Sequence, residues 1–247
     1  MHGSVGAMHE RIQRYLRDRV AAEREAVPAG AFTLYLHPTE DHPFLNYAIP
    51  NEDAAPDDGS ALTAAAQERG LMARVEAVQP CAPWVRDMPG YEVEDELRLM
   101  ATEAPIELES EAEIVVVRRS SPHVAGLMRA QMAAFGEPPP SDEQIARWDG
   151  RSVAALVDGE VVGGASWTLV LDGMTEVAGI GVLERFRRRG IAGALTSAAT
   201  REGFAEGASM AVLVPGHEGA ARVYERAGYA NASRMIHVRR PAAQGGL

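Results

Sequence analysis

The sequence predicts a mixed α/β fold, with a βα series in the C-terminal half and a smaller α+β module before it. Strand-like and helix-like segments alternate along the chain, a pattern typical of sheets covered by helices. An acidic segment at residues 103–113 contains Pro105 and separates two strand-like runs, and 247 residues are enough for two domains with cores of their own. We therefore expect one domain over residues 1–108 and a second over 109–247.

The N-terminal half begins with an amphipathic helix. Ile12, Leu16 and Val20 recur at helical spacing between charged residues, which predicts a helix over residues 8–24 that ends before Pro28. Alternating apolar runs and turn residues predict strands over 32–38 and 44–50 around a turn at 39–43, a helix over 61–69, and strands over 71–78 and 91–101. This half contains no glycine-rich phosphate loop.

The C-terminal half is predicted as a longer series of strands and helices. Asp158 and Gly159 have the chemistry of a two-residue hairpin loop, so residues 152–170 are expected to form a β-hairpin. The whole series is a strand at 113–119, helices at 122–135 and 142–148, the hairpin, a central strand at 175–183, a helix at 190–205, a strand at 209–215, a helix at 219–227 and a last strand at 234–240.

Charge is distributed unevenly along the chain. Of the 24 basic and 35 acidic side chains, residues 1–112 hold 9 and 21, a net charge of −12, and residues 113–247 hold 15 and 14, a net charge of +1. An acidic first half repels nucleic acid and anionic membranes, so neither is expected as a partner. Every basic residue is an arginine, which excludes a Schiff base on lysine and a Walker-type phosphate lysine.

Cysteine usage and the N-terminus indicate a protein of the cytoplasm. Cys81 is the only cysteine, so the chain has no intrachain disulfide and no CxxC metal or redox site. The first 20 residues are charged and amphipathic, without the apolar core of a secretory signal, and no stretch approaches 18 apolar residues. We expect a reducing cytoplasmic environment, no membrane segment and no bound metal.

The segment with the clearest chemistry is TEVAGIGVLERFRRRGIAGALT, residues 175–196. A predicted strand leads through three arginines to Gly190, where a helix of small and apolar residues begins. Unpaired N–H groups and the macrodipole at such a helix start favour an anion such as pyrophosphate, and glycine allows its close approach. The GIG at residues 179–181 leaves a nucleotide-binding enzyme as an alternative, although the full GxGxxG and GxxxxGK[ST] patterns are absent.

Residues 187–192, RRRGIA, resemble the signature [R/Q]-x-x-G-x-[G/A] of the GNAT superfamily of N-acetyltransferases. The resemblance implies a GNAT fold over residues 113–240, acetyl-CoA as co-substrate, its pyrophosphate on the backbone amides of this loop and its pantetheine arm on the preceding strand. The residues implied to bind the coenzyme are Ile180, Gly181, Val182, Arg187, Arg188, Arg189, Gly190, Ile191 and Ala192.

A second stretch of resemblance is HEGAARVYERAGY, residues 217–229, beside the family pattern N-x-x-A-x-x-x-Y-x-x-x-G-[F/Y]. Tyr224 matches the tyrosine that protonates the leaving thiolate, which suits a phenol because its pKa near 10 keeps it protonated at neutral pH. The alternative role is a core tyrosine that packs its helix on the sheet. His217 replaces the asparagine that contacts the coenzyme in the family, and we include it among the cofactor-binding candidates.

The general base is less clearly marked. In related enzymes a carboxylate on the central strand takes the amine proton, directly or through water, so Glu176 is the candidate. A solvent-facing charge at the strand end is an equally good interpretation of Glu176, and His217 is open as a base or as a helix cap. No covalent intermediate is needed, because positioning the amine beside the thioester supplies much of the rate.

The first half contains an echo of the second. Gly90-Tyr91 precedes a strand-like run as Gly228-Tyr229 does, which indicates either a duplication or a chance similarity. A duplication implies a degenerate GNAT-like module that has lost coenzyme binding and lines the acceptor cleft. Its acidity would favour a cationic amine, whereas a solvated surface explains the same charge without a substrate.

The activity expected from these features is transfer of an acetyl group from acetyl-CoA to a primary amine, by direct attack in a ternary complex. The acceptor is a small molecule or a peptide, and a homodimer is compatible with the sequence. The alternative is a non-catalytic acyl-CoA-binding or sensing module with the same fold.

Overall fold

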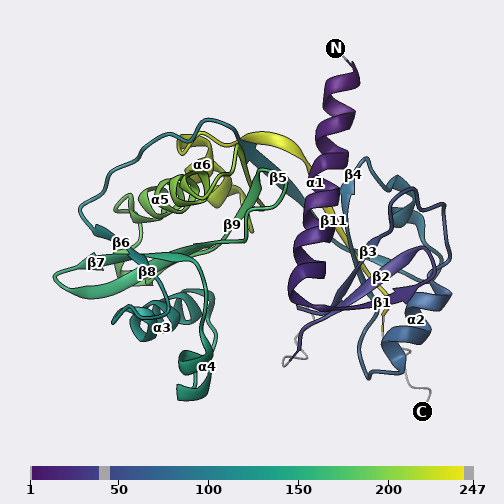
Figure 1. Ribbon diagram of the computed structural model, residues 1–247, viewed down its shortest axis with the longest axis horizontal. Coiled ribbons are helices and arrows are strands. Elements are labelled where there is room, and N and C mark those ends of the chain that lie inside the picture. The colour runs from purple at the N-terminus through teal and green to yellow at the C-terminus, as the bar shows by residue number, and fades with distance from the viewer. Residues whose placement is uncertain (1, 39–44, 242–247) are drawn as a thin grey trace. The chain divides into compact units, whose positions relative to one another are not determined.

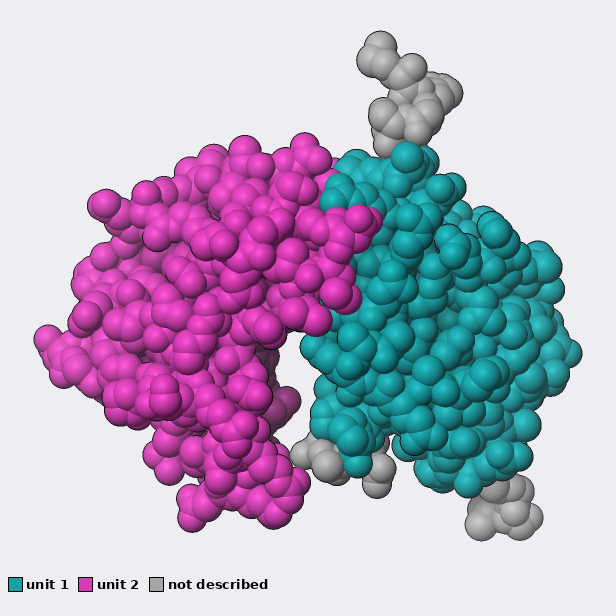
Figure 2. Space-filling view, in the orientation of Figure 1, with its two compact units in different colours: residues 1–99, 232–247 teal, residues 100–231 magenta. Residues whose placement is uncertain are grey.

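The computed structural model describes residues 2–38 and 45–241, so the turn expected at 39–43 lies outside the described residues. The chain divides into two units, here called unit 1, residues 1–99 with 232–247, and unit 2, residues 100–231 (Figure 2). None of the helices in the described ranges is long and apolar enough to cross a membrane.

Unit 1 contains a mixed sheet with the strand order β1-β2-β3-β4-β11 (Figure 1). Neighbouring strands are antiparallel except β3 and β4, which are parallel. The elements are α1 (His2–Glu23), β1 (Glu25–Ala29), β2 (Phe32–Leu36), β3 (Tyr47–Pro50), α2 (Ser60–Gln67), β4 (Arg74–Gln79), the 3-10 helix η1 (Pro83–Asp87), most of β5 (Glu92–Thr102) and most of β11 (Ala230–Arg239).

Unit 2 contains a sheet with the order β5-β10-β9-β8-β7-β6, in which β9 and β10 are parallel and the other pairs antiparallel. Figure 1 shows α5 and α6 on one face of this sheet and α3 and α4 on the other. The elements are β6 (Glu113–Val117), α3 (Val124–Phe135), α4 (Asp142–Arg147), β7 (Ser152–Val157), β8 (Glu160–Trp167), β9 (Met174–Val182), η2 (Glu184–Phe186), α5 (Ile191–Ala205), β10 (Met210–Leu213) and α6 (Glu218–Arg226).

The predicted hairpin of unit 2 is confirmed. Val157 pairs with Glu160, and the two residues between them, Asp158 and Gly159, both have positive φ, 49° and 79°. This is the conformation that a two-residue turn needs to match the twist of its strands. The same chemistry recurs at Asp172 and Gly173, between β8 and β9.

The two units share one order of elements. In each, a meander of antiparallel strands is followed by a crossover helix and a parallel strand: β1-β2-β3, α2 and β4 in unit 1, and β7-β8-β9, α5 and β10 in unit 2. A shorter helix and a last strand then follow, η1 and β5 or α6 and β11. The echoing pairs Gly90-Tyr91 and Gly228-Tyr229 therefore precede equivalent strands.

The last strands are exchanged between the halves of the chain. β11 pairs with β4 of unit 1, from Arg234 opposite Gln79 to Arg239 opposite Arg74, and the end of β5 pairs with β10 of unit 2, with Met100 opposite Leu213. This division differs from the expected boundary between residues 108 and 109. The acidic segment at residues 103–113 predicts a domain boundary from local sequence. Strand pairing over long distances in the chain decides which segments pack together.

One strand, β1, was not predicted. Its sequence EAVPA contains Pro28, which has no N–H to donate to a ladder and is therefore unfavourable inside a sheet. The structure places β1 at the end of the unit 1 order, with β2 as its neighbour. An edge position tolerates proline because one side of the strand needs no partner.

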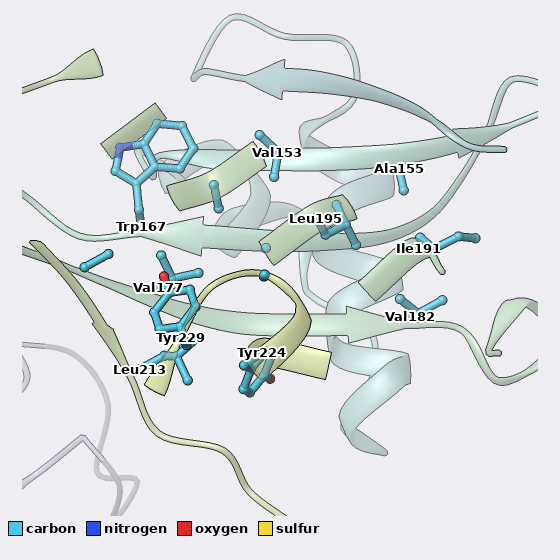
Figure 3. Close-up of a cluster of buried hydrophobic side chains, with 14 of the residues drawn as sticks. Val153, Ala155, Trp167, Val177, Val182, Ile191, Leu195, Leu213, Tyr224 and Tyr229 are labelled. Carbon is cyan, nitrogen blue, oxygen red and sulfur yellow. The ribbon is translucent and has the colours of Figure 1, made fainter. Parts of the chain in front are cut away.

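The core of unit 2 lies between the sheet and the helices α5 and α6. Ile191 and Leu195 of α5 are buried in one cluster with Val153 of β7 and with Val177 and Val182 of β9 (Figure 3). Burial of a side chain of this size contributes about 1.5–3 kcal/mol. This packing fixes the N-terminus of α5 against the end of β9, where the candidate site lies.

Candidate active site

A bulge interrupts β9 in the middle of the sheet. Between Ser166 opposite Ala178 and Gly164 opposite Gly181, β9 has one residue more than β8, and Gly179 has a φ of 62°. The side-chain amide of Gln131 on α3 donates to the carbonyl oxygen of Gly179 at 2.7 Å. An extra residue shifts the alternation of side chains, as expected of a bulge at a functional site.

The glycines of the GIG sequence have structural roles in β9. A Cβ on Gly181 would lie 2.9 Å from the Cβ of Ala134, so α3 packs directly on this strand. Gly179 provides the positive φ of the bulge. Both residues lie within a strand rather than in a strand-to-helix turn, and this geometry removes the basis for the nucleotide-binding alternative.

The parallel strands β9 and β10 are paired from Met174 to Glu176 of β9 and then separate. Their last paired residues are Glu176 and Val212, β10 ends at Leu213, and β9 continues to Val182. No other described strand lies on that side of β9. The edge of β9 at residues 177–182 therefore has no strand partner, and we call this unpaired edge the opening. The candidates Ile180, Gly181 and Val182 line it.

The anion site predicted at the start of α5 has the expected backbone geometry. After η2 the chain runs through the arginines to Gly190, which is the N-cap residue with φ 79° and has no side chain to accept from the first N–H groups. Arg188 also has a positive φ, 67°. The first helical hydrogen bond runs from the Ala194 N–H to the Gly190 carbonyl oxygen, so the N–H groups of residues 191–193 precede it.

The side chains of this loop divide into different roles. Arg187 donates from Nε to the carbonyl oxygen of Val182 at 3.0 Å and from Nη2 to that of Ala134 at 3.1 Å, which holds the loop to the ends of β9 and α3. Arg189 forms an ion pair with Glu111, whose hydrogen bond raises the pKa of the guanidinium. Arg187 to Gly190 are all exposed.

Tyr224 of α6 lies in the core of unit 2 with 8% of its surface exposed (Figure 3). Burial raises the pKa of its hydroxyl to about 12, so the group is protonated at neutral pH. No hydrogen bond joins this hydroxyl to another described residue. The neighbouring Tyr229 differs, because its hydroxyl is 2.7 Å from Oγ1 of Thr200 and its pKa is also raised by burial.

Glu176 lies at the point where β9 and β10 separate. Its backbone is fixed by Thr168, whose Oγ1 accepts from the Glu176 N–H at 2.9 Å and whose N–H donates to the Glu176 carbonyl oxygen at 3.0 Å. Adjacent strand residues point to opposite faces, and Val177 packs in the core with Tyr224. Glu176 and Tyr224 therefore belong to opposite faces of the sheet, on either side of the opening.

His217 is the N-cap of α6. Its Nδ1 accepts from the N–H of Ala220 at 3.2 Å, and the side chain is exposed. Of the roles left open by the sequence, the helix cap is therefore present in the structure. A cap formed through Nδ1 leaves Nε2 as the nitrogen that carries the proton in the neutral ring.

Unit 1 lacks these features at the corresponding places in its order of elements. The N-cap of its crossover helix α2 is Gly59, with φ 70°, but the carboxylates of Asp57 and Asp58 accept from the N–H groups of Gly59 and Ser60 at 2.7 and 2.9 Å. Beside β4, the buried side chain of Gln13 accepts from the Val78 N–H at 2.7 Å. The start of α2 thus has carboxylate acceptors close by, whereas the N-cap of α5 has no side-chain acceptor.

Comparison with known proteins identifies the family. The model of the acetyltransferase (GNAT) family matches residues 107–229. These residues are a GNAT acetyltransferase domain. The family consists of acetyl-CoA-dependent acyltransferases that acetylate amines, so the predicted fold, enzyme class and co-substrate of the C-terminal half are confirmed at the level of the family.

Solved structures extend the similarity to both halves. A GCN5-related N-acetyltransferase from Kribbella flavida is 28% identical, with a TM-score of 0.78 over 96% of this chain and 97% of that one. A putative GNAT acetyltransferase from Novosphingobium aromaticivorans has 20% identity, a TM-score of 0.58, and coverage of 90% and 93%. A tandem GNAT protein from the clavulanic acid biosynthesis pathway shares the fold at 10% identity, with a TM-score of 0.58 and coverage of 87% and 80%. No curated protein matches the chain.

Sequence reasoning does not find two residues near the candidate site. Gln131, which holds the bulge, and Glu111, which pairs with Arg189, lie 48 and 78 residues from their partners in the chain. No local motif marks such contacts. Within the described residues, no group of three or more His, Cys, Asp or Glu side chains is arranged to hold a metal.

Proposed function

We propose that the protein transfers the acetyl group of acetyl-CoA to a primary amine by direct attack, with both substrates bound at the opening between β9 and β10. One observation supports the proposal: pairing of β9 with β10 stops at Glu176 and Val212, and the unpaired part of β9 leads through the arginine loop to the N-terminus of α5. In the proposal the helix start is the phosphate site, the unpaired edge of β9 holds the extended arm, and Tyr224 and Glu176 serve as acid and base.

The coenzyme is held by main-chain groups in this proposal. The amides around Gly190, Ile191 and Ala192 bind the pyrophosphate, because they converge at a helix start with positive potential. The edge of residues 180–182 that has no strand partner pairs with the amide groups of the pantetheine arm, apart from the Val182 carbonyl oxygen, which already accepts from Arg187. Arg187 acts as a brace that fixes the loop through two carbonyl oxygens.

The chemical step requires two proton movements. The carboxylate of Glu176 takes a proton from the amine, directly or through one water, and the amine nitrogen forms a bond to the thioester carbonyl carbon. As the C–S bond breaks, the Tyr224 hydroxyl donates to the sulfur that leaves. Burial makes this phenol a weak acid, so the same desolvation must raise the basicity of the thiolate for the proton to transfer.

The proposal is tested with Tyr224→Phe, by measuring thiol release from acetyl-CoA in the presence of a library of primary amines. Loss of the acid is expected to lower kcat by about 100-fold or more while the dissociation constant of CoA stays close to that of the wild type. Tyr229→Phe is the matched control, because it removes the hydroxyl that is already bonded to Thr200. Its kcat should change little.

Two results would count against the proposal. An unchanged kcat in Tyr224→Phe removes this residue from the chemistry. Binding of CoA without turnover of any amine by the wild type favours the alternative, a non-catalytic acyl-CoA-binding module. Thermal-shift titration with CoA distinguishes binding from catalysis, because a ligand that binds only the folded state raises the melting temperature.

A further inference from the structure

Residues 106–111, here called the strap, lie along α5 and are fixed to one stripe of that helix. The Leu108 N–H donates to Oγ of Ser197 at 3.2 Å, and the same hydroxyl donates to the Ile106 carbonyl oxygen at 2.8 Å. Glu107 forms an ion pair with Arg201. The strap is therefore held at more than one point rather than lying free over the helix.

The helix sequence explains why the strap fits there. Gly193, Ser197 and Arg201 are spaced at i, i+4 and i+8, so they form one line along α5. A Cβ on Gly193 would lie 3.1 Å from Cδ1 of Leu108, so glycine allows the strap to come close. At its start the strap is held by the Ile106 N–H, which donates to the Ala227 carbonyl oxygen at 3.1 Å.

The strap ends at the anion site. A Cβ placed on Gly190 would have the carbonyl oxygen of Glu109 and the Cβ of Ser110 as its nearest neighbours, each at 3.8 Å. The next residue, Glu111, forms the hydrogen-bonded ion pair with Arg189. A carboxylate thus lies beside the loop that is proposed to bind a pyrophosphate.

Several arginines of the loop between β9 and α5 already have partners within the protein. Arg185 pairs with Glu160, Arg189 pairs with Glu111, and the guanidinium of Arg187 is bonded to backbone carbonyl oxygens. The Arg189–Glu111 pair is partly exposed, with 39% and 49% of the side-chain surfaces accessible, so a solvated phosphate can reach it. A phosphate and the Glu111 carboxylate would compete for the guanidinium of Arg189. The two negative groups would also repel each other when both lie beside it.

We propose that Glu111 is an internal counter-anion for Arg189, which the phosphates of acyl-CoA must displace, and that the strap thereby weakens coenzyme binding. The inference rests on the proposed function. In this view Glu111 sets the affinity for the coenzyme and leaves the chemical step unchanged. If the ion pair only held the loop in place, removing the Glu111 carboxylate would loosen the loop and lower the affinity for the coenzyme.

The test is the dissociation constant of CoA measured by calorimetry for the wild type and Glu111→Gln. The variant is expected to bind CoA about three- to tenfold more tightly at low salt, and the gain should shrink at high salt because exposed charges are screened. Pantetheine, which carries no phosphate, should bind both proteins equally. This second ligand separates a charge effect from a change in the shape of the opening.

Glu107→Gln is the matched control. It removes a carboxylate of the same strap from an ion pair of the same kind with Arg201, three helical turns from Arg189. Its CoA affinity should stay within about twofold of the wild type, since the charge lies away from the phosphate loop.

The outcomes separate the two proposals. If the wild type binds CoA but Glu111→Gln binds it with unchanged or lower affinity, the role of Glu111 is wrong and the proposed function stands. If Glu107→Gln tightens binding as much as Glu111→Gln, the effect comes from net charge and the specific role of Glu111 is again wrong. If the wild type does not bind CoA, the proposed function itself fails.

Discussion

At the scale of single residues, the site depends on how each polar group is satisfied. Tyr229 and Tyr224 are both buried, yet only the Tyr229 hydroxyl has a described protein partner, Thr200. His217 differs from Tyr224, because its ring already has a protein partner. This residue was expected to contact the coenzyme, but its Nδ1 accepts from the N–H of Ala220 and caps its own helix. A hydroxyl without a protein partner is the group that remains available to a substrate.

The two tyrosines also predict a dependence of stability on pH. Burial raises the pKa of both hydroxyls, to about 12 for Tyr224, above the value near 10 of an unfolded tyrosine. Their contribution to stability is therefore full below pH 10 and is lost as pH rises through the folded pKa. Urea unfolding between pH 8 and 11 should show a midpoint that falls above about pH 10.

The variant Tyr224→Phe is the control for this dependence on pH. In Tyr224→Phe the alkaline loss should be smaller than in the wild type, because one of the buried hydroxyls with a raised pKa is gone, while Tyr229, Tyr35 and Tyr91 still contribute. A midpoint that is constant up to pH 11 in the wild type would mean that these hydroxyls ionise without being opposed by burial.

At the scale of elements, the contact of α3 with β9 leaves no space for a side chain at Gly181. Gly181→Ala would place a Cβ 2.9 Å from the Cβ of Ala134 and is expected to destabilise the protein by about 1–3 kcal/mol, because helix and strand must move apart. Chemical denaturation measures this change. Gly216→Ala is the control, since nothing lies within 4 Å of its Cβ position; a similar loss there would contradict the packing argument.

Local elements were predictable where a local signal sets them. The start of α5 follows from Gly190 and the small residues after it, and the hairpin follows from Asp158 and Gly159. Strand β1 was missed, because Pro28 is a signal against a strand except at an edge, and edge position depends on the whole sheet.

The candidate site was predictable to the same extent. The phosphate loop and Tyr224 are marked by spacing within short motifs. The bulge held by Gln131 and the ion pair of Arg189 with Glu111 join residues far apart in the chain, so only the folded structure brings them together. The catalytic roles of Tyr224 and Glu176 stay predictions.

At the scale of the whole molecule, the exchanged strands make each half of the chain incomplete. A fragment of residues 109–247 would lack the β5 partner of β10 and the buried Met100, and would expose Ile236 and Val238, which belong to the core of unit 1. A fragment of residues 1–108 would lack the strand beside β4.

We therefore expect neither fragment to fold alone. Circular dichroism with thermal melting should show no cooperative transition for either fragment, and a transition should appear when the two are co-expressed. The intact chain is the control. A sharp melting transition of fragment 109–247 by itself would show that strand β5 is dispensable for the second domain.

The aspartates at the start of α2 have a broader consequence. Asp57 and Asp58 occupy from within the chain the place that phosphate oxygens would take at a helix start. A helix start that is already occupied by carboxylates repels a further anion. If the two units descend from one duplicated domain, the unit with these aspartates is therefore the one that no longer holds a metabolite there.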